Sequence, residues 1–384
     1  MNILFLIDRY PGFGGIEKVT HVLSEKFCTQ LDYRVIVFSI SNQDNDSQLV
    51  QHPNWHYYTS KLKGEELHWY FLSIVDKHKI ETIIYQDSYV EDEYLLEGID
   101  RKKIRVIVCE HSVPNALEIG QEIATKEYPI LSKVGLYRRL VYPYRFTKTS
   151  MRAKRHHRVM MELADDYVLL SPSFKKILLK SYNLCNEKVC AISNPIEDAQ
   201  PYNCGSKENI VLFVGRLTKE KGTNKLMHIW SKIEQTVPDW KLVIVGDGSE
   251  RSNIEGYITK HHLKNVILEG YQTDVAQYYK RAKILFMTSF FEGFGLVLAE
   301  AMSYGVIPFA FNSYASLTDI IDHERNGIII PPFKEKLYAE EFVDLISNGN
   351  RMQSLQNEAI KKAGVFSTDN IVQQWKKLLE NKQS

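Results

Sequence analysis

The sequence predicts an α/β protein made of two doubly wound parallel domains that face each other across a cleft. Short β-branched runs alternate with longer helix-period segments, this alternation occurs twice along the 384 residues, and a Pro/Asn/Gly/Ser-rich stretch at Ser193–Lys207 separates the halves. Strand–helix alternation is typical of a parallel sheet covered by helices on both faces. At about 150 residues per domain, the length also fits two domains.

The predicted strands divide equally between the halves. The first half offers Ile3–Ile7, Arg34–Ser39, Thr82–Tyr85, Ile104–Cys109, Tyr167–Leu170 and Val189–Ile192. The second half offers Ile210–Val214, Lys241–Val245, Asn265–Leu268, Ile284–Met287, Val306–Ala310 and Gly327–Ile330. Helix-period segments between them include Gly15–Cys28, Lys225–Gln235, Phe294–Tyr304 and Lys336–Ser347. We predict Rossmann-like domains at 1–195 and 205–366, and a final helix within 367–384 that can return to the first domain.

The composition excludes several classes of protein. Hydrophobic residues make up 44% and charged residues 25%, which is enough apolar material for two cores, and a net charge of +1 disfavours a dedicated nucleic-acid binder. The five cysteines show no paired spacing, which argues against a disulfide framework or zinc site: Cys28, Cys109, Cys185, Cys190 and Cys204. No apolar run approaches the roughly 18 residues of a membrane span. We expect a cytoplasmic protein, at most peripheral at the inner face of a plasma membrane.

A glycine-rich loop, Asp8-Arg-Tyr-Pro-Gly-Phe-Gly-Gly15, follows the first strand and opens a helix. Gly14 and Gly15 would let a phosphate approach the backbone at the helix N-terminus. The loop is not the dinucleotide fingerprint, because Glu17 stands where its last glycine is required and no acid follows the second strand. A plain strand-to-helix turn is the alternative.

A second loop, Gly215-Arg-Leu-Thr-Lys-Glu-Lys-Gly222, directly follows the strand Ile210–Val214. Arg216 offers a planar fork and Lys221 a point charge, so together they can hold a diphosphate at the carboxyl end of the strand. Lys219 in the same loop is the weaker contact, since surface loops often carry solvated lysines.

The segment Glu292-Gly-Phe-Gly-Leu-Val-Leu-Ala-Glu300-Ala-Met carries two acids eight residues apart. Within a helix that spacing corresponds to about 12 Å. It suits a sugar bound by Glu292 and a ribose bound by Glu300, with a diphosphate over the helix N-terminus. The alternative is an N-terminal helix acid and an unrelated surface glutamate, although the apolar neighbours of Glu300 predict that this carboxylate has a partner.

Two further features remain open between functional and structural roles. His111 ends the strand Ile104–Cys109 and can bind a sugar hydroxyl or simply a backbone carbonyl. The stretch 133–158 contains nine Lys/Arg, two histidines, interleaved Tyr and Phe, and no acid, with Pro143 expected to interrupt any single helix. It suits an anionic membrane surface or acceptor, could also bind RNA, or is a solvated helix face.

Taken together, GFGG near the N-terminus, NPI at the linker, GRLTKEKG, VGDG, EGFGLVLAEAM and the NG at Asn326-Gly327 resemble the family-four group of retaining glycosyltransferases with the GT-B fold. The resemblance is densest from Ile210 to Gly327. It implies that the first domain binds the acceptor and the second the nucleotide sugar. It also implies donor contacts at Gly14, Gly15, His111, Arg216, Lys221, Gly246, Gly270, Tyr271, Glu292, Phe294, Gly295, Leu296, Val297 and Glu300.

The resemblance further implies transfer of a hexose from a nucleoside diphosphate sugar, by default a UDP-sugar, to a growing glycan or lipid-linked acceptor. Such enzymes build capsule, exopolysaccharide or lipopolysaccharide, and retention of configuration without a metal cofactor is expected. Three alternatives stay open: an NAD(P)-dependent oxidoreductase, a non-catalytic nucleotide-sugar-binding subunit of a membrane glycosylation complex, and a related enzyme with a soluble acceptor.

Overall fold

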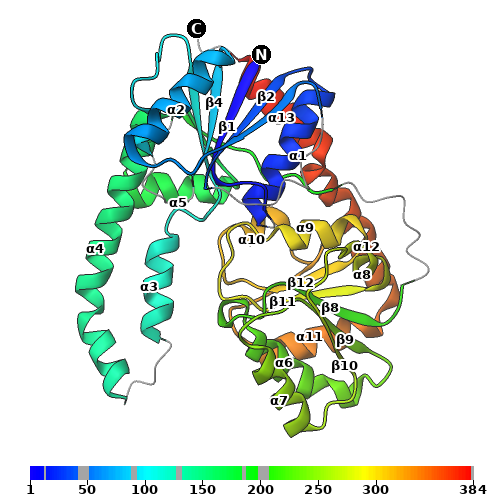
Figure 1. The fold of residues 1–384 in the computed structure, drawn as a ribbon. Helices are drawn as coiled ribbons and strands as arrows, with labels where there is room; N and C mark the ends of the chain where they lie inside the picture. The colour runs from blue at the N-terminus through cyan, green and yellow to red at the C-terminus, as the bar shows by residue number, and fades with distance from the viewer. Residues whose placement is uncertain are drawn as a thin grey trace. The chain divides into compact units, whose positions relative to one another are not determined.

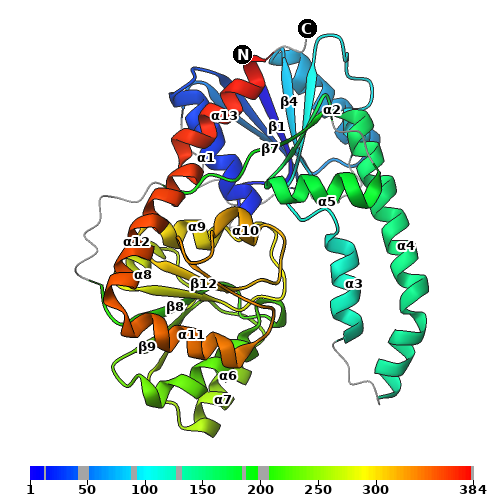
Figure 2. The same ribbon diagram turned by 180° about the vertical axis from the view of Figure 1, so that it is seen from behind.

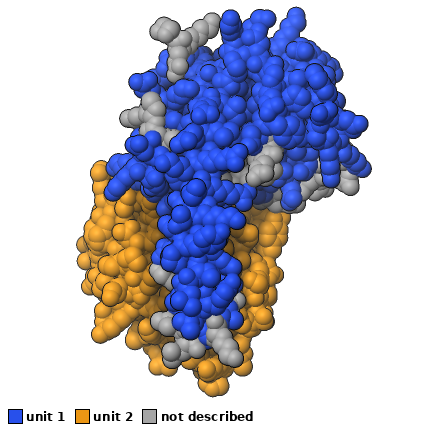
Figure 3. All heavy atoms as spheres, turned by 90° about the vertical axis from the view of Figure 1, so that its left-hand side faces the viewer, with its two compact units in different colours: residues 1–195, 372–384 blue, residues 196–371 orange. Residues whose placement is uncertain are grey.

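The computed structural model describes residues 1–12, 14–41, 52–87, 93–126, 132–183, 187–197 and 207–381. The chain forms two compact units: unit 1 comprises residues 1–195 and 372–384, and unit 2 comprises residues 196–371 (Figure 3). Three features of the sequence discussed above lie outside the described residues, namely Phe13, Cys185 and the linker residues 198–206, which include Cys204.

Unit 1 is built on a parallel sheet whose strand order is β3-β2-β1-β4-β5-β6-β7 (Figure 1). The strands are β1 (Asn2–Arg9), β2 (Arg34–Ser41), β3 (Trp55–Thr59), β4 (Thr82–Asp87), β5 (Arg105–Glu110), β6 (Asp166–Leu169) and β7 (Val189–Ala191). The central strand β1 buries Ile3–Leu6 completely, as expected of a strand covered on both faces. All strands predicted for this half are present, and β3 is an additional edge strand that was not predicted.

Most helices of unit 1 lie on the two faces of this sheet (Figures 1 and 2). They are α1 (Gly15–Thr29), α2 (Gly64–Lys77), α3 (Ala116–Lys126), α4 (Lys133–Leu163) and α5 (Pro172–Tyr182). The C-terminal helix α13 (Thr368–Glu380) begins in unit 2 and then packs on unit 1, where Trp375 meets the Phe27 ring edge-on at 6.3 Å. Tyr33 also donates to the Glu380 carboxylate.

Helices α3 and α4 run side by side as a hairpin that projects from unit 1 (Figures 1 and 2). The expected break at Pro143 is wrong, because α4 continues unbroken from Lys133 to Leu163 with Pro143 inside it. An internal proline removes one backbone hydrogen bond and crowds the preceding turn. Here the ring is exposed to solvent, and the Thr147 hydroxyl donates to the Pro143 carbonyl at 2.8 Å. The free-energy cost of Pro143 therefore does not end the helix.

Unit 2 repeats the architecture with a six-stranded parallel sheet in the order β10-β9-β8-β11-β12-β13. Its strands are β8 (Ile210–Val214), β9 (Lys241–Val245), β10 (Val266–Gly270), β11 (Ile284–Met287), β12 (Ile307–Phe311) and β13 (Ile328–Ile330). Its helices are α6 (Thr223–Ile233), α7 (Arg251–His261), α8 (Ala276–Arg281), α9 (Leu296–Ser303), α10 (Leu317–Ile320), α11 (Glu335–Ser347) and α12 (Gly349–Ala363). Aromatic rings centred on Phe286, Tyr338 and Phe342 fill the core between sheet and helices.

Two histidines pack together where the edge strand β3 meets the end of α2, and of these His78 is buried and His56 half-buried. The rings of His56 and His78 lie 5.2 Å apart, and the Tyr58 hydroxyl is 2.7 Å from His78 Nε2. Lys77 donates to the Tyr58 oxygen, so the Tyr58 proton is available to an unprotonated His78. Burial lowers the pKa of both imidazoles, and the positive charges of Arg34 and Lys77 lower it further.

We expect unit 1 to lose stability as the pH falls below about 6.5. Unfolded histidines titrate near this value, whereas the folded pKa values of His56 and His78 are lower, so the unfolded state binds protons first. Each group can contribute at most about 1.4 kcal/mol per pH unit. Urea unfolding at pH 7.5, 6.5 and 5.5 measures the slope. The double variant His56→Gln/His78→Gln should flatten it, and an unchanged slope in that variant would contradict the assignment.

Candidate functional site

The strand orders place the reversal point of each sheet beside its first strand. In unit 1 the direction of strand addition reverses between β1 and β4, and in unit 2 it reverses between β8 and β11. Doubly wound sheets bind ligands outside the carboxyl ends of the strands at this point. The loops that follow β8 and β11 meet there in unit 2, and they carry the strongest sequence motifs.

Lys221 and Glu292 form an ion pair across this point in unit 2. The Lys221 ammonium lies 2.7 Å from both carboxylate oxygens of Glu292, and the Ser289 hydroxyl donates to the same carboxylate at 2.6 Å. The side chains are 24% and 10% exposed, so water screens the pair only partly. The two residues were predicted to contact different parts of a donor, and the structure brings them into direct contact.

This contact depends on how closely the two loops approach. Gly222 adopts a φ of +65°, and a Cβ at this position would lie 2.0 Å from the Thr288 carbonyl oxygen. The Thr288 hydroxyl lies 3.1 Å from the carbonyl oxygens of both Lys221 and Gly222, and the Phe290 N–H donates to the Glu220 carbonyl. Only glycine fits this crossing, which fixes the Lys221 backbone against the loop that carries Glu292.

Arg216 is exposed, on a loop that is held to the one after β9. The Gly215 N–H donates to Val245, and the Leu217 N–H donates to the Asp247 carbonyl. Gly246 permits this approach, because a Cβ there would lie 1.9 Å from the Gly215 carbonyl oxygen. The loop backbone is therefore fixed while the guanidinium reaches solvent, where an anionic ligand can meet it.

The helix α9 starts beside the Lys221–Glu292 pair. Its N-cap is Gly295 with a φ of +88°, and the buried hydroxyl of Ser316 donates to the Phe294 carbonyl, which fixes the turn before the helix. Leu296 and Val297 in its first turn are partly exposed. The helix N-terminus thus offers backbone N–H groups and a positive dipole next to Glu292.

Glu300 lies within α9 and has the partner that its apolar surroundings predicted. The Tyr279 hydroxyl from α8 donates to Glu300 Oε2 at 3.1 Å. Gly270 ends β10 with a φ of +70° and accepts from the Gly246 N–H, and the next residue, Tyr271, is 63% exposed. Gly270 and Tyr271 thus stand at the carboxyl edge of the unit 2 sheet, and Glu300 lies in the helix that comes after β11.

Unit 1 carries the remaining predicted site residues. Gly14 is the N-cap of α1 and Gly15 its first residue, and the Glu17 side chain folds back so that a Cβ at Gly14 would meet its carboxylate. The positive end of α1 therefore already faces the protein's own acid. His111 follows β5, and its Nε2 pairs with the Gln86 side-chain oxygen at the end of β4. Both positions lie at the carboxyl edge of this sheet.

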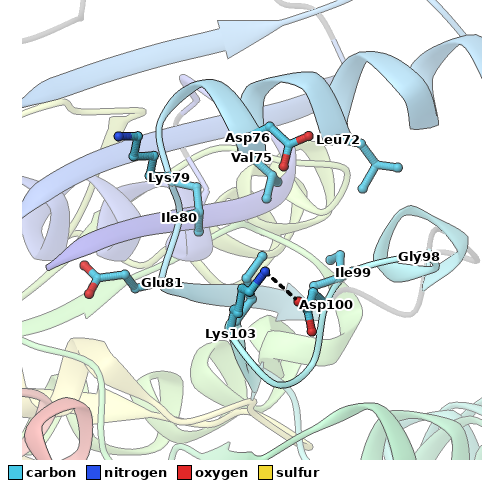
Figure 4. A pocket seen from close by; sticks show the side chains of 11 residues that line it. Leu72, Val75, Asp76, Lys79, Ile80, Glu81, Gly98, Ile99, Asp100 and Lys103 are labelled. Atoms are coloured by element: carbon cyan, nitrogen blue, oxygen red, sulfur yellow. Dashed lines mark ion pairs between the residues drawn. The ribbon is translucent and has the colours of Figure 1, made fainter.

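A surface pocket lies elsewhere in unit 1, between the end of α2 and the segments that precede β4 and β5. Figure 4 shows Lys79, Glu81 and the Asp100–Lys103 ion pair at its rim. Because Ile80 and Glu81 precede β4, the pocket lies at the amino edge of the sheet, opposite the edge where such sheets bind ligands. Its mixed charges favour no particular ligand.

Sequence reasoning missed Ser289, Thr288 and Tyr279. Ser289 and Glu292 form a Ser-x-x-Glu spacing, a signal that could have paired them. Tyr279 gives no such signal, because it contacts Glu300 across 21 residues. In the described part of the chain, no group of three His, Cys, Asp or Glu side chains gathers to hold a metal ion. No helix there is long and apolar enough to cross a bilayer.

Comparison with solved structures identifies the class of fold. The structure of HepE of Anabaena in complex with UDP and glucose covers 100% of both chains with a TM-score of 0.73, at 18% sequence identity. At this identity the likeness shows the fold alone. Together with the two doubly wound sheets, it confirms the predicted GT-B fold class.

Residues 196–362 match the family model of glycosyl transferases group 1. The chain is 27% identical to the amylovoran biosynthesis glycosyltransferase AmsD of Erwinia amylovora over 56% of this chain and 62% of AmsD. It is 28% identical to an N-acetyl-D-galactosaminyltransferase of Campylobacter jejuni over 45% of this chain and 48% of that enzyme. The alignments thus span about half to under two thirds of these relatives. The family match covers less than half of the chain, and it confirms the resemblance of the motifs to glycosyltransferases.

Proposed function

We propose that the protein transfers a hexose from a nucleoside diphosphate sugar to a growing glycan or lipid-linked acceptor, with retention of configuration. The observation that carries this proposal is the arrangement at the carboxyl edge of the unit 2 sheet. There the Lys221–Glu292 pair lies beside the N-terminus of α9, and Glu300 stands further along the same helix. The match of residues 196–362 to the group 1 family model supports the same reaction and disfavours an oxidoreductase.

The chemistry follows from the movement of charge. Breaking the anomeric bond builds negative charge on the leaving diphosphate, which Arg216, Lys221 and the N–H groups at Phe294 and Gly295 would stabilise. Glu292, held by Lys221 and Ser289, would accept hydroxyls of the sugar while its charge balances the ammonium. The acceptor hydroxyl would attack the sugar from the same face that the diphosphate leaves, and the leaving phosphate would take its proton as base. This same-face attack would retain the configuration of the sugar.

Two cations and a helix N-terminus can supply the positive charge that a metal ion supplies in other phosphate sites. We therefore propose a metal-independent reaction that needs no cofactor beside the donor substrate. Turnover should be unchanged in excess EDTA, and a loss of activity restored by Mg²⁺ or Mn²⁺ would refute this part of the proposal.

A UDP-sugar donor and a lipid-linked acceptor are the specific forms that we propose. HepE, which shares the fold, is solved with UDP and glucose. The Campylobacter relative is named for a glycan on undecaprenol diphosphate. The ligands named for these two proteins support the use of UDP-hexoses and undecaprenyl-diphosphate-linked acceptors as probes for this protein.

A donor screen tests the proposed activity. Purified protein is incubated with UDP-, GDP- and ADP-hexoses, with and without undecaprenyl-diphosphate-linked acceptors, and released nucleoside diphosphate is measured. We expect release from a UDP-hexose that rises when acceptor is present. Binding without release in any combination would favour the non-catalytic subunit, and turnover with a soluble sugar acceptor alone would remove the lipid-linked acceptor.

The α3–α4 hairpin supports a lipid surface as the place where acceptor is met. Six large apolar side chains in the distal part of α4 are 48–73% exposed: Val134, Leu136, Tyr137, Leu140, Tyr144 and Met151. Tyr137, Leu140, Tyr144 and Met151 recur at helical spacing and share one face. A second copy of this helix would repel it, since 133–158 contains nine cations and no acid. An anionic bilayer satisfies both the apolar face and the charge.

We expect the protein to bind anionic vesicles and to release them as salt is raised. Co-sedimentation with phosphatidylglycerol-containing and pure phosphatidylcholine vesicles, at 50 to 500 mM NaCl, measures this. At about 1 kcal/mol per cation, the exposed triple variant Arg145→Glu/Lys148→Glu/Arg155→Glu should lose at least tenfold in affinity. The matched variant Lys260→Glu/Lys280→Glu/Lys334→Glu in unit 2 should bind as wild type. Equal binding to both vesicle types would remove the electrostatic part.

A further inference from the structure

A buried tyrosine of unit 2 contacts the acid assigned to the ribose. Tyr279 is 3% exposed, and its O–H donates to Glu300 Oε2 at 3.1 Å. Burial raises the pKa of this phenol well above its usual value, and the nearby Glu300 charge raises it further. The phenol therefore stays protonated at every working pH, so that it remains a donor to the carboxylate.

Two contacts hold Tyr279 in place, one at its ring and one at its backbone. Its ring stacks on the Tyr304 ring at 5.7 Å, just beyond α9. Its carbonyl accepts from Lys207 Nζ at 2.9 Å, and this buried ammonium also donates to the Ala282 carbonyl at the end of α8. A tyrosine fixed at both ring and backbone can impose an orientation on the longer, more flexible Glu300 side chain.

We infer that Tyr279 is a positioning residue, whose buried hydroxyl holds the Glu300 carboxylate in the orientation that accepts the ribose hydroxyls of the donor. This inference rests on the proposed function, which assigns Glu300 to the ribose. Two vicinal hydroxyls need a carboxylate presented in a fixed plane, and the phenol supplies that restraint from the side of the protein interior. Tyr279 itself would not touch the donor.

The test compares the affinities for UDP and 2′,3′-dideoxy-UDP, both measured by calorimetry. Discrimination is expressed as the ratio of the dissociation constant of 2′,3′-dideoxy-UDP to that of UDP. Tyr279→Phe keeps the ring and removes the hydroxyl. We expect it to weaken UDP binding about five- to tenfold, as for the net contribution of one typical hydrogen bond, and to leave the dideoxy nucleotide within twofold. The ratio should therefore fall. A guanosine pair replaces these probes if the donor screen returns a GDP-sugar.

Tyr278→Phe is the matched control, because this neighbour on α8 is also buried and its hydroxyl donates to Glu269 instead. It should leave both dissociation constants unchanged. If Tyr279→Phe weakened both nucleotides equally, or left the ratio at the wild-type value, the positioning role would be overturned.

Glu300→Ala separates this inference from the function beneath it. The proposed function requires this variant to abolish the discrimination. If Glu300→Ala lowered the ratio while Tyr279→Phe did not, only the positioning role would fail. A wild-type ratio in Glu300→Ala would remove the ribose assignment and the positioning role together. Thermal unfolding of each variant confirms that the compared proteins are folded.

Discussion

Replacing Arg216 with alanine is expected to lower kcat by about 10²- to 10³-fold, the loss of roughly 2.7–4 kcal/mol that follows removal of one preorganised donor to a developing anion. The Lys221 charge is already balanced by the Glu292 carboxylate, which lies 2.7 Å away. Because Glu292 offsets part of the Lys221 charge, an arriving diphosphate would depend most on Arg216 and the α9 N-terminus. Steady-state release of nucleoside diphosphate at saturating donor measures the effect.

Lys219→Ala is the control for this variant, since Lys219 lies on the same loop and is also exposed. Lys219→Ala should keep turnover within about threefold of the wild-type value, because Lys219 is not expected to stabilise the charge that develops in the transition state. Wild-type turnover in Arg216→Ala would refute the assigned role. Equal losses in both variants would instead point to a general effect of charge on this loop.

The sequence predicts the elements well where burial alone decides them. Every predicted strand is present, because apolar β-branched runs such as Ile210–Val214 are buried on both faces of a parallel sheet. The edge strand Trp55–Thr59 was missed, since its five residues mix aromatic and polar side chains without alternation and four of them are partly exposed. Pro143 was misjudged because the sequence does not show that a helix continues on both sides of it.

The candidate site was predictable as a set of residues but not as a set of contacts. Arg216, Lys221, Glu292 and Glu300 carry residue types and spacings that suit a nucleotide sugar. Their partners come from separate strands, so they depend on strand order and on loop approach. The Lys221–Glu292 pair spans 71 residues and requires the crossing of Gly222 with the Thr288 carbonyl. No local pattern encodes that crossing, which follows only when β8 and β11 become neighbours.

Gly246→Ala is expected to have the largest effect on stability of the changes considered. Gly246 has a φ of +139°, and an added Cβ would lie 1.9 Å from the Gly215 carbonyl oxygen. Since the colliding atom is backbone, relief requires the Arg216 loop to move away from the loop after β9. We expect unit 2 to lose about 2–4 kcal/mol in unfolding free energy, or roughly 5–10 °C in Tm.

Gly256→Ala is the same kind of substitution at another glycine, and we expect it to raise stability instead of lowering it. Gly256 lies inside α7 with no atom within 4 Å of an added Cβ, so alanine should stabilise the helix by about 0.5–1 kcal/mol. Because Gly246 holds the loop that carries Arg216, its replacement should also weaken UDP binding, whereas Gly256→Ala should not. A Gly246→Ala protein that keeps both Tm and UDP affinity would show that the two loops tolerate separation, and the fixed position assigned to Arg216 would then be unnecessary for binding.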